Sequence, residues 1–313
     1  MRARTMGLLL GYAADRVLGD PQRYHPVAGF GRLANLLESR IYADSRARGA
    51  VHNAVLVGGA VAAGAVSESL THERPIARTL VIAAATWTVL GGRSLEREAD
   101  NVHAVLTAGD LPAARMQVKR LIGRDTDELD ASEISRGVIE SVAENTADAI
   151  TGPLMWGAVL GVPGLLGYRA ANTLDAMVGH HNARYENYGW ASARLDDLAT
   201  WPAARLVGLL TMAADPRRAR AAWTTWRRDA SGHPSPNAGV AESAFAGALG
   251  IRLGGTNHYY GGRRIEHRAI MGDGRPAQPH DIVGANRIAR RVGASAACVA
   301  ALAALVTLRD SSR

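Results

Sequence analysis

Lysine and cysteine are almost absent from this chain of 313 residues, and each absence excludes a kind of site. Lys119 is the only lysine, and its neighbours Val118 and Arg120 exclude the Gly-Lys-Ser/Thr signature of a P-loop. The one cysteine, Cys298, can form neither an internal disulfide nor a cysteine zinc site. Because Cys298 lies in an apolar run, we expect it to be a small buried hydrophobe.

Aromatic residues are also scarce. They make up 5% of the chain, and phenylalanine occurs twice, although hydrophobic residues reach 47%. Large aromatic side chains dominate the cores of soluble proteins. Here the apolar residues are chiefly alanine, valine, leucine and glycine, which suit closely packed membrane helices. The composition therefore favours a membrane protein.

The net charge is +7, and nearly all of the positive charge is arginine. A nucleic-acid-binding protein would show basic clusters with interleaved aromatic residues or a known motif, and the sequence has neither. The charge fits the positive-inside flanks of a membrane protein, and it also fits recognition of a phosphorylated substrate. We expect a lipid bilayer and no nucleic acid as partners.

Three uncharged runs are candidate membrane helices: 54–66, 79–92 and 292–308. A short linker with Pro75 joins the first two, which predicts an antiparallel helix pair. A span needs about 17–25 residues, so each run is at the short end of that range. Arginines before the third run place its start at the cytoplasmic side.

Two further apolar runs, 153–168 and 202–214, make the expected number of spans three to five. Pro163 and Gly164 interrupt the first run, which forms either a simple span or a short or broken helix that lines a cavity, and we favour the broken helix. We predict an all-α, multi-pass membrane protein with one domain over 1–313. Its polar helical and loop segments lie at the cytoplasmic face and cover 93–151, 169–201 and 215–291.

The stretch ESVAENTADAITGPLMW (140–156) places acidic residues directly before an apolar run. Glu140, Glu144 and Asp148 are spaced i, i+4 and i+8, so they share one face of a continuous helix. A solvated acidic face is one interpretation. The other is a Mg²⁺ site, because hard cations take oxygen ligands and Asn145 adds an amide.

Polar residues also recur between 168 and 206. Arg169, Asn172 and Asp175 lie on one side of a predicted helix. They form either ordinary ion pairs on a solvated helix or a site in which arginine binds phosphate and aspartate binds Mg²⁺. Asp196 and Asp197, with Arg194 just before them, extend the same two interpretations.

Two other positions are ambiguous. His180 is a candidate general base, and because the adjacent His181 points in a different direction, the two do not share a metal. Asn237 is either a helix cap or, with Gly239 two residues later, part of a site where backbone approaches an anionic ligand.

These stretches, taken together, resemble the CobD/CbiB family of cobalamin biosynthesis, the adenosylcobinamide-phosphate synthases. The resemblance covers nearly the whole chain. It rests on segments that occur in the same order: LGDPQRYHPV, IGRDT, ESVAENTADAITGPLMW, YRAANTLDAMVGHHNARYENYGWASARLDDLATWPAARL and SPNAGVAESAFAGALGIRLGG. Two departures are mild: NTADAIT replaces a common Asp-Gly pair, and His180 replaces a common tyrosine.

The resemblance implies a multi-pass protein of the cell membrane with its active site facing the cytoplasm. It implies an acid–amine ligase that joins (R)-1-amino-2-propanol or its O-phosphate to adenosylcobyric acid, with ATP and Mg²⁺ as co-reactants. Other cobalamin-pathway enzymes are candidate partners. The alternative is a non-catalytic scaffold or a corrinoid transporter subunit of the same pathway.

Under this hypothesis the polar residues divide into three roles. The metal and nucleotide ligands are Glu140, Glu144, Asp148 and Asp175. The residues that bind substrate or phosphate are Arg169, Asn172, Arg194, Asn145 and Asn237. The catalytic residues are Glu144, Asp196, Asp197 and His180, with Asp196 or Asp197 taking a proton from the incoming amine.

Overall fold

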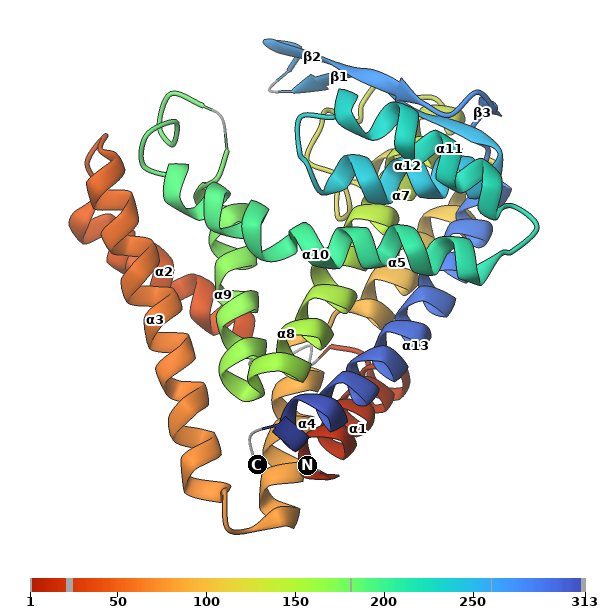
Figure 1. Cartoon of the computed structure of the whole chain (residues 1–313). Coiled ribbons are helices and arrows are strands. Elements are labelled where there is room, and N and C mark those ends of the chain that lie inside the picture. The colour runs from red at the N-terminus through yellow and green to blue at the C-terminus, as the bar shows by residue number, and fades with distance from the viewer. Residues whose placement is uncertain (1, 21–24, 181, 260, 311–313) are drawn as a thin grey trace. The chain divides into compact units, whose positions relative to one another are not determined.

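The computed structural model describes residues 2–20, 25–180, 182–259 and 261–310 (Figure 1). The chain forms two compact units, each built from separated stretches. Unit 1 comprises Met1–Gly91, Asp148–Pro202 and Ala296–Arg313, and unit 2 comprises Gly92–Ala147 and Ala203–Ser295. Because neither unit is one continuous stretch, the expectation of one domain over 1–313 stays a prediction.

Unit 1 is helical throughout its described part. Its complete helices are α1 (Arg2–Leu18), α2 (Pro26–Ile41), α3 (Arg46–Thr71), α4 (Pro75–Val89), α8 (Gly152–Leu160) and α9 (Val162–Val178). The first half of α10 (Trp190–Ala214) and the end of α13 (Pro279–Asp310) complete it. The pair α3 and α4 runs antiparallel around a turn at 72–74, as predicted (Figure 1).

Three helical stretches are long and apolar enough to cross a membrane: Arg46–Thr71, Pro75–Thr107 and Pro279–Val306. They contain the predicted runs 54–66 and 79–92 and the part of the run 292–308 up to Val306. Only 28% of the apolar window of the first stretch is buried within the protein. Cys298, expected to be buried, is exposed, because it lies on α13, where half of the apolar window is uncovered.

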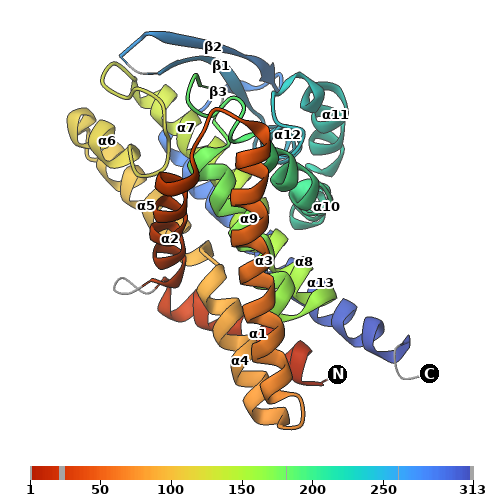
Figure 2. The ribbon, with the colours of Figure 1, turned by 90° about the vertical axis from the view of Figure 1, so that its left-hand side faces the viewer.

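Small residues allow the helices of unit 1 to approach closely. α1 and α4 lie side by side (Figure 2). A Cβ on Gly7 would lie 2.6 Å from Ile82 Cβ, and a Cβ on Gly11 would lie 2.4 Å from Thr86 Cβ. Gly7 and Gly11 are four residues apart, the small-xxx-small spacing of closely packed membrane helices. The small residues therefore allow the close helix packing that the composition predicted.

The apolar run at 153–168 forms a broken helix, as favoured by its sequence. α8 ends at Leu160 and α9 begins at Val162, with Gly161 between them at φ 71°. The backbone amide of Val162 donates to the Glu68 carboxylate over 3.3 Å, so a side chain satisfies one donor that the break leaves free. The other further apolar run, 202–214, forms the latter part of α10, a helix that contains Pro202.

Unit 2 combines helices with a small sheet, so the all-α prediction was right only for the predominant structure. Its complete helices are α5 (Gly92–Thr107), α6 (Leu111–Val118), α7 (Ala131–Thr146), α11 (Ala219–Asp229), the 3₁₀ turn η2 (Ala230–Gly232) and α12 (Ala238–Leu249). Its strands are β1 (Ile251–Tyr259), β2 (Arg264–Met271) and β3 (Arg275–Pro276), in the order β2-β1-β3.

The sheet of unit 2 lies in the segment 215–291, where helices and loops were expected. β1 and β2 are antiparallel, and their register shifts between Leu253 and Gly255. Gly254 and Gly255 have φ angles of 82° and 103°, which only glycine adopts readily, so they form a bulge in β1. This bulge turns a backbone amide toward α7, where the candidate site lies.

Candidate functional site

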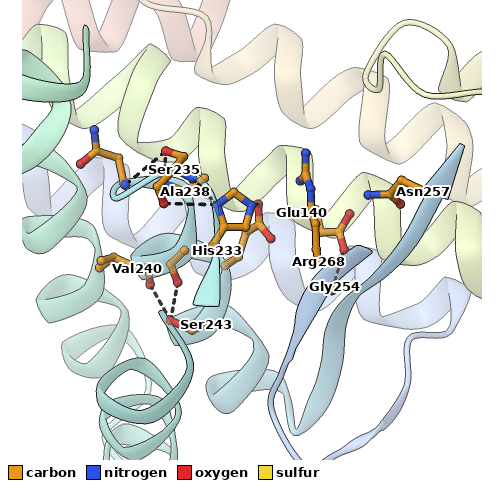
Figure 3. Close-up of polar contacts among 12 residues, drawn as sticks. Glu140, His233, Ser235, Ala238, Val240, Ser243, Gly254, Asn257 and Arg268 are labelled. Atoms are coloured by element: carbon orange, nitrogen blue, oxygen red, sulfur yellow. Dashed lines mark hydrogen bonds and ion pairs between the residues drawn. The ribbon is translucent and has the colours of Figure 1, made fainter. Parts of the chain in front are cut away.

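A cavity of about 110 Å³ in unit 2 gathers charged side chains from α7, the loop before it and the β1–β2 hairpin. We call it the charged recess (Figure 3). It is lined by Leu121, Ile122, Gly123, Arg124, Gly137, Glu140, Ser141, Glu144, Asn257, Tyr259 and Arg268.

α7 presents two of the predicted carboxylates to the charged recess. The helix begins with a capping box in which Asp130 and Glu133 bond each other's backbone amides. Glu140 and Glu144 follow one turn apart on the same face. Gly137, one turn earlier, leaves room for Arg124, because a Cβ there would lie 2.1 Å from its guanidinium.

Glu140 is fully engaged by the protein. Its carboxylate lies 3.1 Å from Arg124 Nη1 and 3.6 Å from Arg136 Nη1. The amide of Gly254 in the bulge donates to it over 2.9 Å. Asn257 Oδ1 accepts hydrogen bonds from both arginines. Removing one partner of such a buried ion group leaves uncompensated charge, so we assign Glu140 a structural role.

Glu144, unlike Glu140, is not held by neighbouring side chains or backbone amides of the described chain. It is exposed within the charged recess, and its carboxylate has no hydrogen-bonding partner among the described residues. Its recessed position and the negative charge of Glu140 raise its pKa above the ordinary value, and Arg268 opposes that shift. Glu144 is therefore the carboxylate in the charged recess that is available to a ligand.

Arg268 on β2 supplies positive charge that acts on Glu144, and no pattern in the sequence singled it out. Its guanidinium lies 3.4 Å from both Tyr259 Oη and Glu266 Oε2. The nearby carboxylates raise its pKa despite burial, so it stays charged. Arg268 combines a fixed cation with a neighbouring phenol, a pair suited to phosphate or carboxylate.

A second unpredicted feature is the buried pair of Glu242 on α12 and His233 in the turn before it. Glu242 is fully buried, and its oxygens accept no hydrogen bond from any described residue. His233 Nε2 lies 3.6 Å away, and the His233 side chain is 4% exposed. The only sequence signal was an acid within the apolar run AGVAESAFAGAL.

Electrostatics keep this pair uncharged. Burial raises the pKa of Glu242 well above its ordinary value, and the charges of Glu140 and Glu144 raise it further. Burial and the positive charge of Arg268 lower the pKa of His233. A neutral carboxylic acid beside a neutral imidazole can hold a proton next to the charged recess.

Unit 1 contains a separate line of hydrogen bonds, which we call the α9–α10 polar chain. Arg169 Nη1 donates to Asn172 Oδ1 over 3.5 Å, and Asn172 Nδ2 donates to Asp196 Oδ1 over 3.2 Å. Thr200 Oγ1 links Asp196, at 3.5 Å, to Tyr168 Oη, at 2.9 Å. Three predicted residues, Arg169, Asn172 and Asp196, therefore meet.

Arg169 is surrounded by negative charge. Asp20, Asp148 and Asp196 all interact with it electrostatically. Asp148 belongs to the π-helical turn Ala147–Thr151 that follows α7. Because the charge of Arg169 is already balanced by three acids, we do not assign it to substrate phosphate.

The other predicted residues lie elsewhere. His180 is exposed in the loop after α9, and His181 lies outside the described residues. Arg194 is exposed, and Asp197 is half-buried. Asn145 donates to the Ser141 carbonyl over 2.9 Å within its own helix.

Asn237 is at the N-cap position of α12 but makes no side-chain cap. Its Oδ1 accepts instead from Arg205 Nη1 over 2.9 Å. The expected close approach at Gly239 is to protein rather than to a ligand, because a Cβ there would lie 2.4 Å from the Ala230 carbonyl.

The four predicted metal ligands do not form one ligand set. In residues 2–20, 25–180, 182–259 and 261–310, no group of three or more His, Cys, Asp or Glu side chains could hold a metal ion. Glu140 and Glu144 belong to unit 2, whereas Asp148 and Asp175 belong to unit 1. α7 ends at Thr146, and the π-helical turn breaks the predicted i, i+4, i+8 face.

Comparison with known proteins identifies one family. The family described as "CobD/Cbib protein" matches residues 8–289. No solved structure matches the chain.

Three curated relatives, each named "Cobalamin biosynthesis protein CobD", illustrate the similarity. The chain is 46% identical over 305 residues to that of Mycobacterium tuberculosis (strain ATCC 25618 / H37Rv), covering 96% of each chain. It is 41% identical over 310 residues to that of Geobacter metallireducens, again covering 96% of each. It is 38% identical over 306 residues to that of Rhodobacter capsulatus, covering 96% of this chain and 97% of the relative.

Proposed function

The chain belongs to the CobD/CbiB family, and from that premise we propose that it is an amide-forming enzyme of cobalamin biosynthesis. Its substrates are adenosylcobyric acid and (R)-1-amino-2-propanol or its O-phosphate, and its co-reactant is ATP. The product is adenosylcobinamide or its phosphate. The membership supports a role in cobalamin biosynthesis, and the charged recess supports the chemistry.

Amide formation from a carboxylate needs activation. In the proposed reaction, a carboxylate oxygen of the corrinoid attacks the γ-phosphorus of ATP, which forms an acyl phosphate and releases ADP. The amine then attacks the acyl carbon, phosphate leaves, and the amine loses a proton. Phosphoryl transfer depends mainly on positioning and on cationic groups that stabilise the phosphoryl oxygens.

The observation that carries the proposal is that Glu144, which has no hydrogen-bonding partner among the described residues, lines the same recess as the cation Arg268. Glu144 is exposed in the charged recess and has a raised pKa, which suits a base that accepts the amine proton near neutral pH. Arg268 and Tyr259 lie on the hairpin that lines the same recess. We assign them to the phosphate of the amine substrate.

We assign a different role to the α9–α10 polar chain. Its members use their hydrogen bonds on one another, and the charge of Arg169 is balanced by three acids. A line of this kind holds α9 and α10 in register. Asn172 and Asp196 therefore act as positioning residues in this proposal.

Magnesium fits the described residues only as an ion carried by nucleotide. Mg²⁺ is usually held by one or two carboxylates together with substrate phosphates, and it does not require a cage built only of protein ligands. Because Glu144 is assigned as the base, we assign no described carboxylate to the ion, and nucleotide phosphates would supply its ligands. When bound, Mg²⁺ would neutralise phosphate charge.

We further propose that the protein resides in the cell membrane with the charged recess at the cytoplasmic face. The three long apolar helical stretches support membrane residence. The arginine-rich segment 215–291 contributes to the recess, and the positive-inside rule favours the cytoplasmic side for such segments.

The test is an amide-forming assay on the full chain in nanodiscs. We would supply adenosylcobyric acid, aminopropanol phosphate, ATP and Mg²⁺ and follow the corrinoid product by mass. Wild type should form product, and Glu144→Gln should lower kcat at least 100-fold, the lower range for losing a general base. Glu128→Gln, an exposed acid in the same unit, is the matched control and should match wild type.

Two outcomes would contradict parts of this proposal. Folded wild-type protein that forms no product with either amine would favour the scaffold or transporter alternative. Product formed equally by wild type and Glu144→Gln would preserve the activity but remove Glu144 from the chemistry.

A further inference from the structure

A second and larger cavity lies in unit 2, with a volume of about 400 Å³. We call it the Arg–Trp cavity. It is formed by α10, α11, the turn around η2 and the start of α12. It is lined by Arg205, Trp226, Arg227, Ala230, Ser231, His233, Pro234, Pro236 and Val240.

The charged side chains that line the Arg–Trp cavity are positive. Its two lining arginines carry positive charge, its histidine is neutral, and no carboxylate is among its described lining residues. The hydrogen bond from Arg205 to Asn237 fixes the direction of that guanidinium. Arg227 makes no ion pair in the described chain, whereas the next residue, Arg228, is paired with Asp229 and Asp273. Arg227 therefore offers positive charge to an anion in the cavity, and Arg205 adds a guanidinium of fixed direction.

The indole rings of Trp226 and Trp223 lie close to these arginines. Trp226 packs on α10 at Gly208, where a Cβ would lie 2.7 Å from the indole ring. The Trp226 and Trp223 rings meet edge to face, with centroids 5.4 Å apart. The Arg227 guanidinium lies 5.4 Å from the Trp223 ring centroid. A planar wall with adjacent guanidinium groups suits a ligand that has both an aromatic base and phosphates.

The Arg–Trp cavity and the charged recess differ in volume. Sites for small molecules and cofactors occupy roughly 300–1,000 Å³. The Arg–Trp cavity, at about 400 Å³, falls within that range, whereas the charged recess, at about 110 Å³, does not. A nucleotide therefore fits the larger cavity and a small phosphorylated amine fits the smaller one.

The buried acid–imidazole pair connects the electrostatics of the two cavities. His233 lines the Arg–Trp cavity, and its Nε2 has no hydrogen-bonding partner among the described residues. Glu242, 3.6 Å from that nitrogen, feels the charges of Glu140 and Glu144 in the charged recess. A ligand in the Arg–Trp cavity therefore lies beside this pair, whose carboxyl group interacts electrostatically with the acids of the charged recess.

We propose that the Arg–Trp cavity binds a nucleoside triphosphate, with its base against Trp226 and its phosphates on Arg205 and Arg227. The inference rests on the proposed function, because that function requires ATP, and it names where the nucleotide binds. It also accounts for the absence of a P-loop lysine, since arginines replace lysine as the phosphate ligands.

The test is calorimetric binding of ATP, inorganic triphosphate and AMP to the full chain in nanodiscs. Wild type should bind ATP, and Arg227→Gln and Arg205→Lys should each weaken that binding at least tenfold. Trp226→Leu should weaken ATP and AMP more than triphosphate. Arg263→Gln, in the exposed β1–β2 turn, is the control and should bind ATP like wild type.

The two arginine variants are chosen so that a loss of ATP binding cannot be explained by misfolding. Arg227 is exposed, so its glutamine variant leaves the core intact, and Arg205→Lys retains the charge but loses the planar fork. Unchanged ATP binding in both arginine variants would overturn the inference. Binding of a short-chain anionic phospholipid that depends on these arginines, without ATP binding, would assign the cavity to lipid headgroups and also overturn it.

This inference and the proposed function can fail separately. A wild type that forms amide product, with an unchanged KM for ATP in Arg227→Gln and Arg205→Lys, would preserve the ligase and reject the Arg–Trp cavity as its nucleotide site. ATP binding that depends on both arginines, without amide product, would preserve the nucleotide site and reject the ligase.

Discussion

Two glutamates one turn apart on α7 have opposite surroundings. Glu140 is held by two arginines and a backbone amide, whereas Glu144 is exposed and has no hydrogen-bonding partner in the part of the chain that the structure describes. Their spacing alone does not distinguish them. The difference arises from Arg124 and the β1 bulge, which both lie on the side of Glu140.

Glu242 leads to a prediction about pH and stability. Its folded-state pKa lies well above the ordinary 4.5, so the folded protein keeps a proton that the unfolded chain has released between the two values. Stability therefore falls as pH rises through that interval, by up to about 1.4 kcal/mol per pH unit. Glu242→Gln removes this loss, so its unfolding midpoint should exceed that of wild type at pH 8.

The measurement is thermal unfolding in detergent between pH 4.5 and pH 8. The difference between Glu242→Gln and wild type should vanish at the acidic end, near the ordinary value. Glu128→Gln should follow wild type throughout. A constant difference at all pH values would show that Glu242 is ionised in the folded state.

Some site residues could be predicted from the sequence and others could not. Glu144, Asn172 and Asp196 stand in polar stretches next to apolar ones, and the structure places each in a polar cluster. Arg268 and His233 are distant from those stretches in sequence. They reach the acids through the β1–β2 hairpin and the turn before α12, so only tertiary structure reveals them.

At the scale of elements, the broken segment α8–α9 depends on one residue. Gly161 has φ 71° and ψ −143°, a conformation that only glycine adopts readily. A Cβ there would also lie 2.3 Å from the Glu68 carboxylate, which accepts the amide of Val162. Gly161→Ala should lower the free energy of unfolding by about 1–3 kcal/mol.

Thermal unfolding of the purified protein in detergent would check this. Gly58→Ala is the matched control, because Gly58 lies inside α3 with no atom within 4 Å of a Cβ. It should leave stability unchanged or raise it, since alanine is the better helix former. Equal loss in both variants would mean that the conformation at Gly161 is not what matters.

Elements with strong local signals could be predicted well. The apolar runs became helices because their composition and length favour that state, and proline with glycine marked the break after α8. The β1–β2 hairpin was missed. The segment 215–291 was predicted to form helices and loops, whereas Gly254 and Gly255 form a bulge within a strand that pairs over long range.

At the scale of the whole molecule, the length of α3 predicts that this helix crosses the membrane. Its 26 residues extend about 39 Å, more than the hydrocarbon thickness of about 30 Å. Cysteines at Ala43→Cys and Glu73→Cys, before and after α3, should therefore label from opposite sides of the membrane. Cys298→Ala provides a cysteine-free background, because Cys298 is the only cysteine.

An impermeant thiol reagent on sealed vesicles of known orientation would measure this. Arg263→Cys, in the exposed β1–β2 turn, should react from the cytoplasmic side. Reaction of Ala43→Cys and Glu73→Cys from the same side would show that α3 does not cross the membrane.

The chain passes between its two units four times, and the last passage lies within α13. During synthesis the chain leaves the ribosome from its N-terminus, so neither unit has all its segments until α13 has emerged. Both units therefore mature together, after translation has almost finished. A premature stop before residue 279 would yield two incomplete units, and such a chain should be a substrate for membrane proteases rather than a partly active enzyme.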